Sequence, residues 1–227
     1  AAMLTTLAAP AFAKTWYIED GDITVKASDT GNDVTQKDKT TYGDKDTIIT
    51  NRKEDASSNT VTIETNDKND KVEVTLKDVN IDTSSRKKAA VSVTGEGDTN
   101  IKLDGDNALK SDIYRSGIYG SGSGSLTISG GENDSLTAQG GAGGSGIHIS
   151  RNGSLTISGG TVTANGDDGG SGIYSSNSSS VTISGGMVTA NGGSGNISGG
   201  DGICSDSGDV TISGGTVTAT GGGSTGS

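Results

Sequence analysis

Short runs of alternating apolar and polar residues recur through the second half of this chain. A Gly-Ile pair, preceded by Ser or Asp, occurs four times, at spacings of 29, 26 and 30 residues from Ser116 to Ser145, Ser171 and Asp201. Each pair is followed by an apolar-Thr-Ile-Ser-Gly-Gly unit and then by an apolar-Thr-Ala unit. Alternation over so few residues has the period of a strand, and no stretch between these units has the period of a helix. The pattern predicts three short strands in every repeat.

Three strands per repeat, separated by glycine-rich turns, are typical of one coil of a three-sided β-solenoid. Stacked coils rise by the strand spacing of about 4.8 Å, so every strand pairs with its equivalents above and below. We expect the repeated apolar residues to point inward as four ladders. They are Ile118/Ile147/Ile173/Ile203, Leu126/Leu155/Val181/Val210, Ile128/Ile157/Ile183/Ile212 and Leu136/Val162/Val188/Val217.

The same frame continues more weakly into the first half of the chain. Val61 and Val91 precede Ile118 at similar spacing, and we expect Ile101-Lys-Leu103 to align with Leu126-Thr-Ile128 at 25 residues. The segments Val74–Leu76, Val79–Ile81 and Asn107–Leu109 complete these earlier coils, the last two on the third side.

Before residue 60 the repeat is harder to follow. Asp22–Lys26 and Thr47–Thr50 have strand periodicity, whereas Ser28–Lys45 between them is mainly polar. Trp16 and Tyr17 supply the large side chains that a cap over the first coil needs. We therefore predict an all-β, right-handed parallel β-helix of about six coils of 25–30 residues. Residues 14–59 would form an N-terminal cap and the first strands, and 60–227 the repeats, which we expect to continue beyond Ser227.

Residues 1–13 resemble the end of a secretory signal. They are small and apolar, contain Pro10, and end in the small-x-small site Ala11-Phe12-Ala13. We expect an exported protein whose mature chain begins near Lys14. No later stretch approaches the roughly 20 apolar residues that span a bilayer, so membrane insertion is not expected.

The composition agrees with a thin, extended core. Only 29% of residues are apolar and 3% aromatic, whereas 39 are glycine. One proline and no three-residue glycine period exclude collagen, and one cysteine excludes a disulfide scaffold. The net charge of −11 argues against a nucleic-acid partner. Charge is also uneven, because residues 1–115 hold 16 of the 17 Lys and Arg.

One outward column carries candidate binding chemistry. Tyr119, His148, Tyr174 and Cys204 each follow a core isoleucine, so we expect them to stack on one face. Tyr119, His148 and Tyr174 would form a platform on which the apolar faces of sugar rings can pack. The alternative is a ladder that only stabilises the sheet, by roughly 0.2–1 kcal/mol per cross-strand pair. Threonine columns on the other faces resemble ice-binding arrays, but Met187 and Ser135 interrupt them.

Acidic residues near predicted turns are candidate calcium ligands. Asp98, Asp104, Asp106 and Asp112 offer the hard oxygens that Ca²⁺ takes in sets of six to eight. The alternative is that they make local hydrogen bonds within turns. A lyase would also need a basic residue beside such carboxylates. Its candidates also fit a solvated charged turn: Arg86, Lys87, Lys88 and Lys102.

Several stretches together resemble a group of secreted surface proteins of gut and clostridial bacteria, described as carbohydrate-binding-domain proteins. The resemblance rests on Trp16–Val25, Val74–Ile81, Leu103–Asn107 and the Thr-Ile-Ser-Gly-Gly-Thr-Val-Thr-Ala repeats. More remotely the chain is similar to pectate-lyase-like β-helices. The resemblance implies a right-handed β-helix, assisted by calcium, that binds plant cell-wall polysaccharide without cleaving it at the surface of a Gram-positive bacterium.

The sequence therefore predicts a non-catalytic β-helix that binds polysaccharide or serves as an adhesin-like stalk. Two alternatives stay open at this point: a calcium-dependent, pectate-type lyase and a purely structural spacer.

Overall fold

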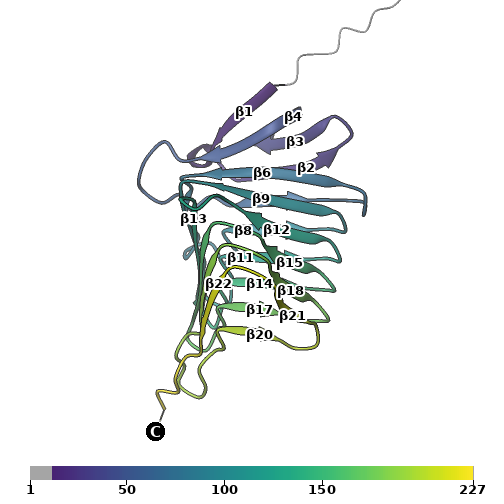
Figure 1. The fold of residues 1–227 in the computed structure, drawn as a ribbon. Coiled ribbons are helices and arrows are strands. Elements are labelled where there is room, and N and C mark those ends of the chain that lie inside the picture. Colours follow the sequence, from purple (N-terminus) through teal and green to yellow (C-terminus); the bar gives the residue numbers. More distant parts are fainter. Residues whose placement is uncertain (1–11, 227) are drawn as a thin grey trace, which may run out of the picture.

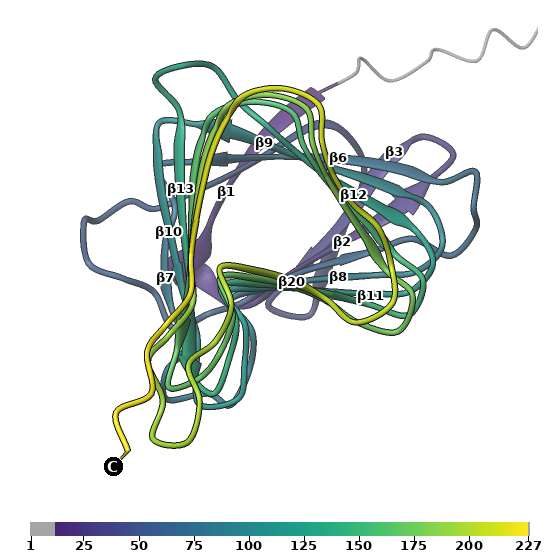
Figure 2. The same cartoon turned by 60° about the horizontal axis from the view of Figure 1, so that its bottom comes forward.

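A computed structural model describes residues 12–226, and these form a parallel β-solenoid of about six coils. The strands stack into three long faces (Figure 1), which enclose the core when the stack is viewed close to its axis (Figure 2). One 3-10 turn, η1 (Ile18–Asp20), is the only helical element of the described chain. No helix among these residues is long and apolar enough to cross a membrane.

Each face takes one strand from each coil. Face 1 comprises β2 (Ile23–Ser28), β5 (Val61–Glu64), β8 (Val91–Thr94), β11 (Ile118–Ser121), β14 (Ile147–Ser150), β17 (Ile173–Ser175) and β20 (Ile203–Ser205). Face 2 comprises β4 (Lys39–Thr50), β6 (Lys71–Lys77), β9 (Asp98–Asp104), β12 (Ser125–Ser129), β15 (Ser154–Ile157), β18 (Ser180–Ile183) and β21 (Val210–Ile212). Face 3 comprises β7 (Asn80–Asp82), β10 (Asp106–Lys110), β13 (Ser135–Ala142), β16 (Thr161–Asp167), β19 (Met187–Asn191) and β22 (Thr216–Thr220).

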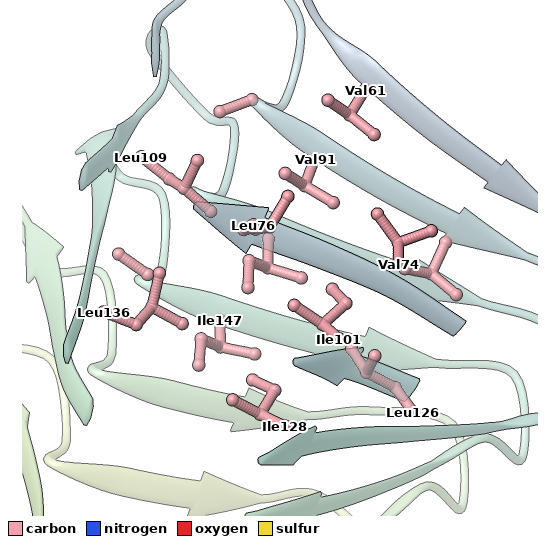
Figure 3. Close-up of a cluster of buried hydrophobic side chains, with 14 of the residues drawn as sticks. Val61, Val74, Leu76, Val91, Ile101, Leu109, Leu126, Ile128, Leu136 and Ile147 are labelled. Atoms are coloured by element: carbon pink, nitrogen blue, oxygen red, sulfur yellow. The ribbon is translucent and has the colours of Figure 1, made fainter. Parts of the chain in front are cut away.

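The predicted ladders of the last four coils are confirmed. Ile118 pairs with Ile147, Ile147 with Ile173 and Ile173 with Ile203, and the other three ladders keep their registers in the same way. Most of these side chains are fully buried. Figure 3 shows Leu126, Ile128, Leu136 and Ile147 in the interior together with buried side chains of the preceding coils. A few apolar residues per coil therefore suffice, because each coil is covered by the next.

One predicted register is wrong. Ile101 pairs with Ile128, two residues later than expected, and Leu126 pairs with Thr99. The spacing of 27 residues that joins Val74 to Ile101 is thus kept at the next step. Thr99 is 2% exposed and its hydroxyl has no hydrogen-bond partner, so a polar residue occupies an inward position that the pattern search passed over.

The N-terminal end is closed by strands that run across the stack. The polar stretch Ser28–Lys45, for which no strand was predicted, forms β3 (Gly31–Gln36) and the first part of β4. β3 pairs antiparallel with both β2 and β4 and so joins faces 1 and 2. β2 and the second part of β4 pair in parallel with β5 and β6, so the strands expected at Asp22–Lys26 and Thr47–Thr50 lie in the stack of coils.

The strand β1 (Phe12–Tyr17) covers the outer edge of β4. Trp16 is buried, as expected of a cap, and its indole Nε1 donates a hydrogen bond to Oδ2 of buried Asp44 at 2.8 Å. Thr47 Oγ1 donates to the same carboxylate oxygen at 3.1 Å. Of the expected leader, residues 1–11 lie outside the described residues, whereas Phe12 and Ala13 begin β1.

The last coil has no such cover among the described residues. Val210 is 42% and Ile212 55% exposed, although their equivalents one coil earlier, Val181 and Ile183, are fully buried. The inward register is therefore maintained where nothing in the described chain packs against it.

Candidate functional site

Face 1 carries the predicted aromatic column. Tyr119 pairs with His148, His148 with Tyr174 and Tyr174 with Cys204, so the four outward side chains stack as expected. The ring centroids of Tyr119 and His148 are 5.3 Å apart in an edge-on arrangement, and those of His148 and Tyr174 are 4.7 Å apart with a 30° tilt. The structure thus brings the three candidate binding residues together in one aromatic cluster.

Each ring is fixed by a polar neighbour one coil further on. The Tyr119 hydroxyl lies 3.2 Å from Ser150 Oγ, and His148 Nε2 lies 2.9 Å from Ser176 Oγ. The Tyr174 hydroxyl donates a hydrogen bond to Oδ2 of Asp206 at 2.7 Å. These bonds hold the rings in place, which lowers the entropy that a ligand would have to remove.

His148 and Tyr174 of this column are uncharged near neutral pH. Burial lowers the pKa of His148 and outweighs the opposing effect of Asp206, so the imidazole is neutral. The hydrogen bond to Asp206, together with burial and the nearby charges of Asp206 and Cys204, raises the pKa of Tyr174 to about 12. A neutral aromatic surface suits contact with the C–H faces of sugar rings better than it suits a free ion.

Next to the column lies a groove that the sequence did not reveal. The outward residues at the same position in earlier coils are small, Thr62 and Ser92, and they pair upward to Tyr119. The change from small to aromatic side chains leaves a hollow of about 540 Å³ above the small ones. Its lining residues are Thr60, Thr62, Lys88, Ala89, Ser92, Tyr114, Arg115, Ser116, Tyr119 and His148.

Two turns at the corner between faces 3 and 1 form the wall of the groove. The first precedes β8 and carries Lys88, and the second precedes β11 and carries Tyr114 and Arg115. Asp112 Oδ2 accepts a hydrogen bond from the Lys87 amide at 2.8 Å, and Arg115 Nε donates to the Lys87 carbonyl at 3.1 Å. The two turns are thus bound to each other through both the amide and the carbonyl of Lys87.

The groove is lined by cations and hydroxyls, and no carboxylate of the described residues lines it. Arg115 takes part in none of the ion pairs found in this part of the chain. Lys88 lies 3.5 Å from Asp22 Oδ2, which Arg86 also contacts at 2.9 Å. The polar groups facing the groove are therefore mainly hydrogen-bond donors.

The four predicted calcium ligands do not meet in one place. Asp98 accepts a hydrogen bond from Ser125 and Asp106 one from Ser135, Asp104 pairs with Lys77, and Asp112 binds the Lys87 turn. Nowhere in residues 12–226 do three or more acidic, His or Cys side chains gather as metal ligands would. These residues do not fit a shared calcium site, because each of them already has a different hydrogen-bond or ion-pair partner. Calcium binding by a single turn stays a prediction.

Three of the basic lyase candidates and the single histidine also have defined contacts. Arg86 and Lys88 contact Asp22, and Lys87 binds Asp112 through its amide. His148 does contact a serine, Ser176, but Ser176 is only 7% exposed. A nucleophile must reach its substrate, so this pair fits a structural role better than catalysis.

The column was predictable because it repeats, whereas the groove was not. Tyr114 and Arg115 fall in a turn between strands, outside the periodic positions, and no spacing in the sequence marks them. The one available signal was a tyrosine and an arginine next to the first Ser-Gly-Ile triplet, at a place where later coils have Ala142–Gly144 or Asp168–Gly170.

Comparison with known proteins supports the architecture. Residues 155–173, 181–203 and 210–227 match a family model described as a beta helix repeat. With the solenoid itself, this match supports a pectate-lyase-like β-helix. No curated protein and no solved structure matches the chain.

Proposed function

We propose that this β-helix repeat protein binds polysaccharide on face 1 and does not cleave it. The observation that carries the proposal is the ordered, neutral stack of Tyr119, His148 and Tyr174 beside a groove rich in hydrogen-bond donors. Aromatic faces for the sugar ring and polar groups at its edge are the two elements of a small-ligand site of this kind.

Polysaccharide binding would suit a protein that is located at the cell surface or in the extracellular space. The sequence resemblance and the signal-like residues 1–13 favour export, and stacked coils offer several equivalent contacts to a long polymer. Repetition of weak contacts along one polymer raises the combined affinity without any single strong site. An adhesin-like stalk is compatible with the same surface.

A lyase of this fold would need a base beside carboxylates that hold calcium. The groove has Lys88 and Arg115 but no carboxylate among its described lining residues, so binding is the better-supported function. Incubation with pectate and calcium tests the alternative, and the appearance of unsaturated product would establish the lyase.

The binding proposal is tested on a glycan array followed by calorimetry. We expect the wild type to bind at least one plant or host polysaccharide, and Tyr119→Ala to weaken that binding about three- to tenfold, since an aromatic contact contributes about 0.5–1.5 kcal/mol. The control is Tyr42→Ala, which removes a more exposed tyrosine from β4, away from the groove.

An array with no hit would reject polysaccharide binding. If, in addition, no glycan raised the melting temperature, the structural spacer would be the better description.

A further inference from the structure

Tyr114 stands out among the residues around the groove because of its backbone. It has a φ of +57°, a left-handed conformation that a bulky side chain seldom adopts, and its side chain is 77% exposed. Strain of this kind persists only where the surroundings enforce it, and it is concentrated at ligand clamps and active sites.

Hydrogen bonds around the turn enforce this conformation. The Tyr114 amide donates to the Ala142 carbonyl at 2.8 Å, and the Arg115 amide donates to the Asp112 carbonyl at 2.9 Å. Asp112 Oδ1 also accepts from the Ile113 amide at 2.7 Å. The turn is therefore held from both sides, and its tyrosine is kept out in solvent.

The ring of Tyr114 has space only because the next coil has a glycine beside it. A Cβ atom at Gly143 would lie 2.7 Å from two ring carbons of Tyr114, and Gly143 itself has a φ of +72°. The ring thus lies along this corner and lines the groove, which Tyr119 and His148 line from face 1. Aromatic surface therefore borders the groove from two different elements.

We infer that Tyr114 is a further binding residue, and that the groove grips a short glycan segment between the Tyr114 ring and the Tyr119–His148 rings. Arg115 and Lys88 donate hydrogen bonds to ring and hydroxyl oxygens of that segment, and the hydroxyls of Thr62 and Ser92 lie on the opposite side. The inference rests on the proposed function and makes it local: recognition is concentrated where β8 meets β11 and does not extend evenly along face 1.

The rigid turn favours such a grip. The exposed ring is already positioned, so a ligand that packs on it loses little entropy in ordering the protein. A pocket of this size accepts a ligand of a few sugar units, within the usual range for small-ligand sites. Contacts beyond those units would add little.

The experiment measures Kd by calorimetry for cello-, xylo- and galacturono-oligosaccharides of two to six units. The variant Tyr114→Gly removes the ring and suits the left-handed backbone, so folding is retained and the melting temperature does not fall. We expect about tenfold weaker binding for Tyr114→Gly, which corresponds to about 1.4 kcal/mol. Tyr114→Phe keeps wild-type affinity. The matched control is Ile113→Ala, which alters an exposed apolar residue of the same turn that does not line the groove.

Oligosaccharide length separates a local grip from an extended platform. A local grip predicts that affinity stops increasing beyond about three units, whereas affinity that rises steadily to six units would overturn it. Wild-type affinity in Tyr114→Gly, with binding weakened in Tyr119→Ala, would overturn the role of Tyr114 and leave the proposed function intact. A wild type that binds no oligosaccharide in any series, and no polysaccharide on the array, would reject both.

Discussion

The two ends of the solenoid complete the same core in different ways. At the N-terminal end, β1 and β3 cover strand edges, and Trp16 and Asp44 form a buried hydrogen-bonded pair. At the C-terminal end of the described chain, β20, β21 and β22 present free edges, and Ile212 lies more than half exposed. The difference shows that a coil gains its burial from the neighbour that covers it and not from its own sequence.

The surfaces of the two regions differ as well. The first coils are joined by ion pairs between successive strands, such as Lys26–Glu64 and Lys77–Asp104, whereas the last coils present Ser, Thr and Gly. Both halves nevertheless keep the same register. Exposed ion pairs each contribute little, about 0–1 kcal/mol, so the shared architecture must come from the inward ladders and the strand pairing.

The largest effect is expected at the cap. Trp16→Ala removes a buried indole and leaves Asp44 without its Nε1 donor, and truncations of this size cost about 3–5 kcal/mol. For a chain of this length about 1 kcal/mol lowers the melting temperature by about 2–4 °C, so we expect a fall of roughly 10 °C in a circular-dichroism melt. An unchanged melt would show that the first coils are stable without the cap.

The next effect compares two members of one ladder. Ile157→Ala creates a cavity at a fully buried position and should cost about 2–5 kcal/mol. Ile212→Ala makes the same chemical change at the exposed end and should cost well under about 1 kcal/mol. Denaturant titrations of both variants test this, and equal losses would show that something covers the last coil.

A smaller effect is expected in the pH dependence of stability, which should differ between the first and the last coils. Burial raises the pKa of Asp22 in the first coils, but hydrogen bonds from Thr60 and Arg86 and the charges of Arg86 and Lys88 outweigh it and lower the pKa. A lowered pKa means that the ionised form stabilises the fold. This contribution is complete above the unfolded pKa of about 3.9 and is lost as pH falls through the folded value.

The last coils should lose stability at high pH instead of at low pH. Burial, the hydrogen bond to Asp201 and the charges of Asp201 and Asp206 raise the pKa of Cys204 to about 11, and that of Tyr174 is raised to about 12. Here the neutral forms stabilise the fold, fully below the unfolded values of about 8.5 and 10, and the contributions are lost as pH rises through the folded ones.

Isoleucine methyl NMR can follow the two regions separately. We expect Ile63 to lose its native signal first in acid and Ile183 first in alkali. Simultaneous loss at both extremes would mean that the coils unfold as one cooperative unit.

The smallest effect concerns calcium. Because Asp98, Asp104, Asp106 and Asp112 each already bind a different donor of the chain, we expect excess chelator to shift the melting temperature by less than about 1 °C. A marked fall would support the calcium prediction and direct attention to a single turn.

The sequence predicted what repeats. The isoleucine ladder and the outward column beside it recur in every late coil, so their register and their face could be predicted directly. Prediction from the sequence failed where non-periodic side chains determine the structure. Leu126 covers Thr99, a polar residue that no hydrophobic pattern detects, and β3 forms from a polar stretch because the free edges of β2 and β4 need a partner.

The groove was missed for a related reason. Tyr114 is placed by the hydrogen bond that its amide donates to the Ala142 carbonyl, in a turn that is adjacent only after the coils have stacked. The amides of Ile113 and Arg115 donate to Asp112 within its own turn. Such contacts depend on which residues of two neighbouring turns lie side by side, and the sequence alone does not indicate this. The metal-ligand hypothesis for Asp112 shows the same limit, because its acidity was visible in the sequence but its partner, the Lys87 amide, was not.

The only tryptophan and the only cysteine lie at opposite ends of the stack. Six strand spacings of about 4.8 Å separate the first and last strands of face 1, a distance of about 29 Å. A dye on Cys204 can therefore accept energy from excited Trp16, with no residue added to the chain. The energy transfer between this pair would report the distance between the two ends of the stack. Followed during unfolding, it would show at what rate that distance increases.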